Sequence, residues 1–218
     1  MLGFFVFKGV INTMDESRWL NLMAAWGFEQ NLQVFSELEK AYSQSGRFYH
    51  NAQHVDACLV HFDNIKANLT YPREVELALW FHDAIYKIFS SNNEKNSAIW
   101  ARDFLLDNGA ALDAASRAYD LILATRHNAP AATLDASFLV DIDLSILGAT
   151  LRVYAQFEQD IRREYRMVPS AIYRKKRIAV LQGFLRRETI FNNAPFSSQL
   201  EAQARDNIKA AITNLMAC

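Results

Sequence analysis

Histidine placement carries the most chemical information in this chain, because only five histidines are present. His50 and His54 are four residues apart, so on a helix, or at its start, their side chains point the same way. His82 is followed directly by Asp83, and His127 lies within the string Thr-Arg-His-Asn. Imidazole nitrogens and carboxylate oxygens are ligands of divalent metal ions, so these residues are candidate metal ligands.

Two carboxylate-bearing segments are otherwise apolar. His82 and Asp83 lie within Leu-Ala-Leu-Trp-Phe-His-Asp-Ala-Ile-Tyr, residues 77–86. Asp141 and Asp143 lie within Phe-Leu-Val-Asp-Ile-Asp-Leu-Ser-Ile-Leu, residues 138–147. A carboxylate in a core-facing apolar helix is costly unless it is paired or bound to a metal. Both segments therefore predict a compensating cation.

Two imidazoles and two carboxylates form a mixed nitrogen and oxygen ligand set. Such a set suits a divalent ion such as Mn, Fe, Co, Ni or Zn, or Mg if water completes its octahedron. An octahedral ion held this way keeps two positions for water and substrate, which is typical of a catalytic site. The two cysteines, Cys58 and Cys218, form no cluster that predicts a structural zinc site. We interpret them as buried or unremarkable thiols in a reducing cytosol.

The elements that position these residues are predicted to be helices. The chain has only seven glycines and four prolines and is rich in Ala, Leu, Arg and Glu, which favours an all-α fold. Apolar residues recur at helical spacing through about ten segments, and no strand is expected. The first predicted helix starts near Thr13, and the second covers Leu32 to Tyr42 and stops near Ser45-Gly46. The third covers 51–68, the fourth begins at Pro72 and continues through His82, and the fifth runs from 92–94 to 108–109. The remaining five cover roughly 111–126, 133–147, 149–166, 170–188 and 197–216.

A chain of 218 residues without a linker or a repeat predicts one domain over residues 1–218, folded as a compact multi-helix bundle. Residues 1–6 are apolar, but no basic region precedes them and no cleavage site follows. We expect the first dozen residues to dock on the domain or to be partly mobile. No segment has the apolar length of a membrane span, so we expect a cytoplasmic protein with no membrane partner.

Positive charge is concentrated in one segment. Between Arg152 and Ile190 there are ten Lys and Arg residues against four acids, although the net charge of the chain is −1. This asymmetry favours an anionic partner, and an ordinary solvated helix face explains it equally simply. Nucleic-acid binding is not expected, because the chain is near neutral and lacks the interleaved aromatic and basic residues of such modules.

Several strings together resemble the bacterial family of predicted metal-dependent phosphohydrolases of the HD superfamily. They are Arg-Phe-Tyr-His-Asn-Ala-Gln-His (47–54), Trp-Phe-His-Asp-Ala-Ile-Tyr (80–86), Asn93-Glu94 with Ser97-Ala98, Asp-Ile-Asp-Leu-Ser-Ile-Leu-Gly (141–148), Ile-Arg-Arg-Glu-Tyr (161–165) and Phe-Leu-Arg-Arg-Glu-Thr-Ile-Phe (184–191). The resemblance covers roughly residues 15–215. It implies an HD-type helical bundle that hydrolyses a phosphoester, such as a nucleotide or a related small phosphorylated metabolite.

Carried over to this sequence, the resemblance implies metal ligation by His54, His82, Asp83 and Asp143. Asp143 is preferred to Asp141 because members of the superfamily usually show the final Asp just before a helical stretch containing Leu or Lys. Asp83 could also accept a proton from a bound water or bridge to a second ion.

Further roles follow for residues near these strings. His50 is a candidate to contact a phosphate or to support the metal ligands, and His127 to act on the leaving group or to join a second metal. Glu94 is expected to orient substrate or a second water, or simply to complement a helix dipole. The candidate phosphate-binding arginines are Arg47, with its planar fork, and Arg163, Arg166, Arg174 and Arg177 in the basic segment.

Two alternative functions remain open at this point. A di-iron oxygenase on the same scaffold needs more ligands, for which His50 and His127 are the only obvious spare histidines. A non-catalytic nucleotide-sensing module would keep the metal pocket and use the basic segment for binding. The sequence does not identify the substrate, the metal, the number of ions or the oligomeric state.

Overall fold

A computed structural model describes residues 14–217, and within them the prediction of an all-α fold with about ten helices is confirmed. The α-helices are α1 (Glu16–Trp26), α2 (Leu32–Tyr42), α3 (Ala52–Ile65), α4 (Pro72–Phe81), α5 (Asn93–Asp107), α6 (Leu112–Ala124), α7 (Leu134–Asp143), α8 (Leu151–Glu164), α9 (Ser170–Leu185) and α10 (Phe196–Ala217), with two short 3-10 helices, η1 (Lys66–Asn68) and η2 (Leu144–Gly148). The segment expected to dock or to be mobile at the N-terminus, and Cys218, lie outside the described residues.

Helix ends follow local chemistry that is readable in the sequence. The side chains of Asp15, Asn51 and Thr133 accept hydrogen bonds from backbone N–H groups in the first turns of α1, α3 and α7. Pro72 occupies the first turn of α4, where its missing N–H costs nothing. Gly27 follows α1 with φ of 74°, a left-handed conformation that glycine adopts without strain.

Two predicted helices are shorter than expected. The segment predicted as 133–147 is an α-helix only to Asp143 and then tightens into η2. The helix beginning at Pro72 ends at Phe81, so His82 is its C-cap residue rather than a member of a continuing helix. In both cases the helix ends beside a candidate metal ligand, and the chain turns there.

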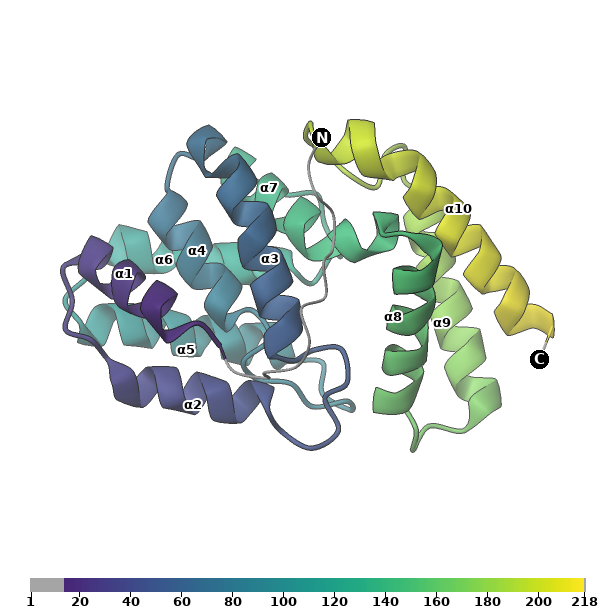
Figure 1. Ribbon diagram of the computed structural model, residues 1–218, viewed down its shortest axis with the longest axis horizontal. Helices are drawn as coiled ribbons and strands as arrows, with labels where there is room; N and C mark the ends of the chain where they lie inside the picture. The colour runs from purple at the N-terminus through teal and green to yellow at the C-terminus, as the bar shows by residue number, and fades with distance from the viewer. Residues whose placement is uncertain (1–13, 218) are drawn as a thin grey trace.

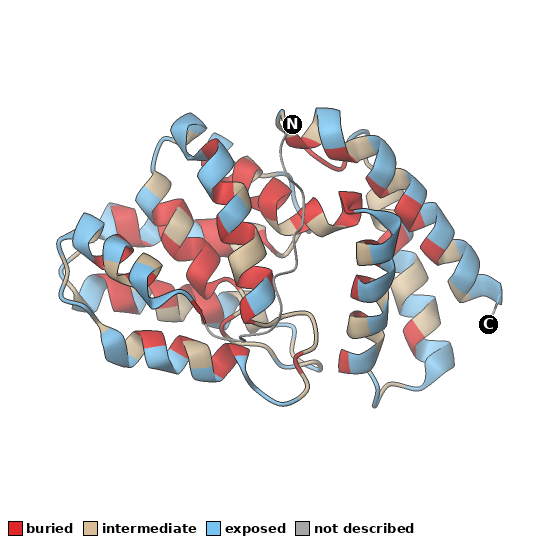
Figure 2. Ribbon diagram, viewed as in Figure 1, coloured by how far each residue is buried: buried red, intermediate tan, exposed pale blue. Residues whose placement is uncertain are grey.

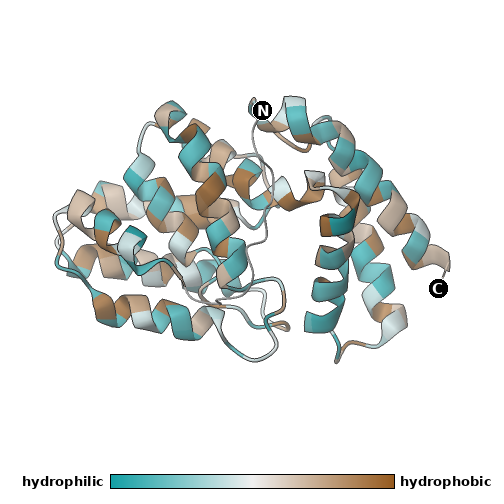
Figure 3. Ribbon diagram, in the orientation of Figure 1, coloured by the Kyte–Doolittle hydropathy of each residue, from teal (hydrophilic) through white to brown (hydrophobic). Residues whose placement is uncertain are grey.

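The helices divide into two neighbouring groups (Figure 1). Helices α1 to α7 pack together, while α8, α9 and α10 lie side by side at the other end, connected through η2. Buried residues are concentrated where α3, α4 and α7 face one another (Figure 2). By contrast, α8 carries hydrophilic residues along much of its length (Figure 3).

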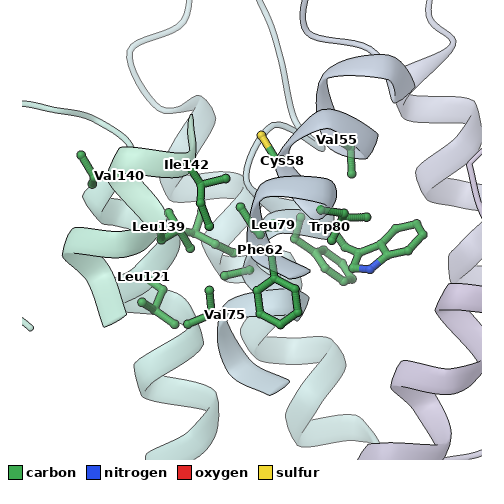
Figure 4. Packing of buried hydrophobic residues seen from close by; sticks show 14 of the residues in the cluster. Val55, Cys58, Phe62, Val75, Leu79, Trp80, Leu121, Leu139, Val140 and Ile142 are labelled. Atoms are coloured by element: carbon green, nitrogen blue, oxygen red, sulfur yellow. The ribbon is translucent and has the colours of Figure 1, made fainter. Parts of the chain in front are cut away.

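The helices that carry the candidate ligands share one apolar core. Figure 4 shows Val55 and Phe62 of α3, Leu79 of α4 and Ile142 of α7 packed against one another. All four side chains are at most 2% exposed. Because close-packed interiors resist displacement, this core fixes the relative positions of the three helices and therefore of the ligands at their ends.

The C-terminal group is joined to the core by close backbone contacts at η2. A Cβ at Gly148 would lie 2.5 Å from the Cβ of Leu200 on α10, so only glycine fits there. The buried Asn207 side chain donates to the carbonyl oxygens of Leu147 and Ala149. None of the helices within residues 14–217 is long and apolar enough to cross a membrane.

Candidate metal centre

Two imidazoles from different helices face each other in the interior. His54 lies in the first turn of α3 and His82 caps α4, and both are buried. Their Nε2 atoms are 3.0 Å apart. The Nδ1 atom of His82 lies 2.8 Å from the carbonyl oxygen of Leu79, to which it donates. This bond keeps one proton on Nδ1, so Nε2 is the ring nitrogen that can bind a cation once its own proton is released, as is usual for metal-binding histidines.

Two carboxylates complete the cluster. Asp143 Oδ1 is 3.2 Å from His54 Nε2 and 3.7 Å from His82 Nε2. Asp83 Oδ2 is 3.2 Å from His82 Nε2 and 3.6 Å from His54 Nε2. Adjacent ligands of an ion with bonds of about 2.1 Å lie about 3.0 Å apart in an octahedron and about 3.4 Å apart in a tetrahedron. The distances from both carboxylate oxygens to the two imidazole nitrogens are therefore compatible with one divalent ion.

The charges in the cluster also favour a bound cation. Although burial opposes ionisation, hydrogen bonds from His127 and His54 hold the pKa of Asp143 well below its usual range. Burial likewise opposes ionisation of Asp83, but the neighbouring imidazoles hold its pKa well below normal. Burial disfavours a charge on His82, yet the two carboxylates raise its pKa to about 9. Without a metal, the added proton on His82 partly offsets the carboxylates; a divalent ion would replace it.

Metal affinity is accordingly expected to rise with pH. An ion must displace the proton that the carboxylates hold on His82, so below a pH of about 9 each bound ion releases at least one proton. Affinity should increase about tenfold per pH unit between about pH 6 and 8. Calorimetric titration with Mn²⁺ in buffers of different ionisation enthalpy measures both the affinity and the proton release. A pH-independent affinity would contradict this account of the site.

Asp141 has a different role from Asp143, although only Ile142 separates them. Asp141 is fully buried, and its carboxylate accepts hydrogen bonds from the backbone N–H and side-chain amide groups of both Asn192 and Asn193. Burial raises its pKa, and these four donor groups oppose that shift. Asp141 thus anchors the segment before α10, and Asp143 is the aspartate that faces the two histidines.

Cys58 is part of the cluster, a feature that the sequence interpretation missed. Its buried Sγ lies 3.8 Å from both ring nitrogens of His54, and a possible metal-binding group in the described residues combines His54, Cys58, His82 and Asp143. The His54-x-x-x-Cys58 spacing on one helix was the available signal. Burial, assisted by Asp143 and Asp83, raises the pKa of the Cys58 thiol, which makes it a poorer ligand than the nearby carboxylate of Asp83.

His127 contacts the cluster from the turn after α6. Its Nε2 donates to Asp143 Oδ2 at 2.9 Å, so Asp143 presents one oxygen to His127 and the other to His54. His127 has φ of 54°, an uncommon conformation for a residue with a side chain. Its Nδ1 is buried and has no hydrogen-bond partner among the described residues. Strained residues with unmatched polar atoms are found preferentially at functional sites.

His50 is fixed by a carboxylate from the C-terminal group of helices. Glu164, at the end of α8, accepts from the backbone N–H groups of Phe48, Tyr49 and His50 at 2.8–3.0 Å. Its other oxygen accepts from His50 Nδ1 at 2.7 Å and from the hydroxyl of Tyr86 at 2.8 Å.

The charges of this pair reinforce each other. Burial opposes a charge on His50, but Asp83 and Glu164 raise the pKa of His50 above its ordinary value. Burial of Glu164 is outweighed by His50 and the backbone donors, which lower the pKa of Glu164 to about 2. The imidazole is therefore held on Nδ1, and its ring centre lies 6.2 Å from that of His54.

The phosphate-binding role predicted for Arg47 is not supported by its contacts. The side chain is buried, and it donates to the carbonyl oxygens of His50, Asp83 and Ala84 at 2.6–3.2 Å. Arg47 therefore holds the loop before α3 against the turn that carries Asp83. The sequence could not separate these roles, because a guanidinium satisfies carbonyl groups as readily as it binds phosphate.

The remaining predicted residues have carboxylate or aromatic neighbours. Arg177 makes two contacts with Glu158, at 2.6 and 3.1 Å, and Arg163 is paired with Asp160 and lies over the ring of Phe48. Arg163 and Arg177, both predicted to bind phosphate, are thus paired with carboxylates of α8. Glu94, in the first turn of α5, lies 3.7 Å from the Nε atom of Arg126, so no contact of Glu94 with the cluster is observed.

A scan against protein-family models and searches of curated proteins and of solved structures found no match to this chain.

Proposed function

We propose that this chain is a metal-dependent phosphohydrolase of the HD type, with His54, His82, Asp83 and Asp143 as its metal ligands. The observation that carries the proposal is the spacing of the four ligand atoms, 3.0–3.7 Å for five of their pairs, in a largely buried cluster whose two carboxylates favour a cation. The resemblance of the sequence motifs to HD phosphohydrolases adds the reaction class.

The chemistry of the proposed site follows from its ligands. A divalent ion bound there would lower the pKa of a coordinated water towards about 7 and offset negative charge on a phosphate. The ligand set of two nitrogens and two oxygens leaves positions for water and substrate on an octahedral ion. Asp83 and Asp143 each have a second carboxylate oxygen, and that of Asp143 is hydrogen-bonded to His127. This bond fixes the orientation of the carboxylate.

Two histidines outside the ligand set are suited to proton transfer. His50 is held on Nδ1 by Glu164, so its Nε2 is the atom available to exchange a proton. The strained turn at His127 holds a second imidazole against Asp143. In the proposed reaction His50 donates a proton to the leaving oxygen, and His127 keeps the ligand carboxylate ionised. The substrate class is a small phosphoester, with nucleotides as the first choice.

The proposal is tested by a screen of phosphoesters against divalent metals with purified protein. Chelation should abolish turnover, and re-addition of one metal should restore it, because the water that attacks phosphorus is activated only by a bound ion. His82→Gln should be inactive with every metal, whereas the matched His61→Gln variant, on the opposite part of α3 beside Phe196, should retain activity.

The outcomes of this screen also separate the competing functions. Turnover that survives chelation, or equal loss in the His61→Gln variant, would contradict a metal-dependent hydrolase. Tight nucleotide binding without turnover across all metals would indicate a sensing module instead. Oxygen consumption that requires iron would indicate an oxygenase.

A further inference from the structure

Arg187 is a half-buried cation that has no acidic partner in the described part of the chain. Of its five N–H donors, one is used: its Nη2 donates to the carbonyl oxygen of His127 at 2.7 Å. The face of the guanidinium lies 4.7 Å from the ring centre of Phe184. Burial lowers the pKa of Arg187, and no carboxylate offsets this effect. A partly desolvated guanidinium with free donors favours an anionic ligand.

The position of Arg187 connects it to the metal cluster through a single residue. The carbonyl of His127 accepts from Arg187, and the imidazole of the same residue donates to Asp143. Only His127 therefore lies between Arg187 and the candidate ligand Asp143, although 44 positions separate these two residues in the sequence. A substrate in contact with both the metal cluster and the Arg187 guanidinium would have to reach across His127.

The segment that carries Arg187 is held in place by hydrogen bonds to partly buried side chains of α10. Arg205 donates to the carbonyl oxygens of Leu185, Arg187 and Glu188. The carboxylate of Glu201 accepts from the N–H groups of Ile190 and Phe191. Asp141 holds the next two residues, as described above. A guanidinium on such a preorganised backbone loses little freedom when it binds a ligand.

Two arginines that the sequence singled out, Arg163 and Arg177, and the neighbouring Arg186 differ in this respect. Arg163 and Arg177 are paired with Asp160 and Glu158. Arg186, the neighbour of Arg187, is exposed on the outer side of α9 and makes no side-chain hydrogen bond or ion pair with the described residues. Arg187 alone among these combines partial burial, an unmatched charge and a link to the metal cluster.

We propose that Arg187 binds a phosphate group of the substrate, so that the substrate is held at one end by the metal cluster and at the other by the guanidinium of Arg187. The planar fork can donate two parallel hydrogen bonds to phosphate oxygens, which a lysine cannot do. This inference deepens the proposed function and rests on it. It favours substrates whose phosphate carries a free dianionic end, such as nucleoside mono- or diphosphates, over phosphodiesters buried within a chain.

The test is binding of inorganic pyrophosphate to the Mn²⁺-loaded full-length protein, measured by calorimetry without any turnover. Arg187→Gln is expected to weaken pyrophosphate binding by about 10- to 100-fold, since a charge-assisted hydrogen bond is worth about 1.5–3 kcal/mol. Arg187→Lys, which keeps the charge but not the fork, should give an intermediate loss. The matched control Arg186→Gln should bind within about twofold of wild type. Affinity for Mn²⁺ should be unchanged in all three, which shows that the cluster is intact.

Three results would overturn the assignment of Arg187. They are wild-type affinity in Arg187→Gln, an equal loss in Arg186→Gln, and no pyrophosphate binding by the metal-loaded wild-type protein. A separate outcome concerns only the proposed function: pyrophosphate binding that depends on Arg187, combined with no turnover of any phosphoester, would support the binding site and reject hydrolysis.

Discussion

Asp143→Asn is expected to reduce divalent-metal affinity by more than about 100-fold, because even the loss of a group that only supports a metal ligand costs 10- to 100-fold. The Asn side chain fits the same space, so the helical content should not change. In the absence of metal the variant should be less stable than wild type, because the hydrogen bonds from His127 and His54 that hold the pKa of Asp143 low stabilise its ionised form in the folded protein. Calorimetric titration with Mn²⁺ and chemical unfolding in chelator measure the two effects.

The matched variant Asp141→Asn should keep the metal affinity that Asp143→Asn loses. It leaves the metal cluster intact, so Mn²⁺ affinity should stay near that of wild type. It removes the charge that accepts four donor groups from Asn192 and Asn193 and turns one acceptor into a donor. We expect a loss of about 1–3 kcal/mol in the free energy of unfolding. Loss of Mn²⁺ affinity in Asp141→Asn, together with normal affinity in Asp143→Asn, would show that Asp141 is the ligand.

Glu164→Ala is expected to give the largest loss of stability, about 3–5 kcal/mol. The substitution leaves three backbone N–H groups, the His50 imidazole and the Tyr86 hydroxyl without their common acceptor, and each unsatisfied buried donor is costly. It also breaks the contact through which α8 holds the loop before α3. The measurement is urea unfolding at neutral pH, followed by circular dichroism.

The same carboxylate predicts a loss of stability in acid. The pKa of Glu164 is lowered to about 2 in the folded protein from an ordinary value of 4.5. Its stabilising contribution is therefore complete above about pH 4.5 and is lost as the pH falls from about 4.5 to 2. The control is Asp160→Asn on the same helix, whose pair with the exposed Arg163 should contribute less than about 1 kcal/mol. If both variants lose equal stability, Glu164 does not hold the loop.

Much of the fold was predictable because helix signals are local. Apolar spacing, N-cap residues and Pro72 mark most helices to within a few residues, and the structure confirms the all-α prediction. The ends at Phe81 and Asp143 were not predicted. At these positions the chain leaves the helix because of contacts that are distant in sequence, such as the carbonyl bonds of Arg47 to Asp83 and Ala84. Such tertiary contacts have no local signal.

The candidate metal cluster was predicted better than the residues around it. Histidine is rare and carboxylates in apolar helices are conspicuous, so His54, His82, Asp83 and Asp143 could be selected from the sequence and its resemblance. The choice between Asp141 and Asp143 was less secure, because both lie in the same apolar string and only the asparagines near position 192 distinguish them.

The roles of the arginines and of Glu164 could not be assigned from the sequence. Arg47, Arg177 and Arg187 are chemically identical, and their roles depend on whether a carbonyl, a carboxylate or no acid lies nearby in space. Glu164 lies in one of the strings that carry the resemblance but was assigned no role, and its side chain is completely buried. Sequence periodicity places a residue on a helix face but does not identify the distant group that it contacts.

The central claim is that four side chains from α3, the end of α4 and the end of α7 bind one divalent ion. Anomalous diffraction from crystals soaked in Mn²⁺ tests it most directly. The account predicts a single strong peak at about 2.0–2.3 Å from His54 Nε2, His82 Nε2, Asp83 Oδ2 and Asp143 Oδ1. A fully soaked crystal with no peak between these atoms, or with the ion bound by Asp141 or Glu164 instead, would contradict it.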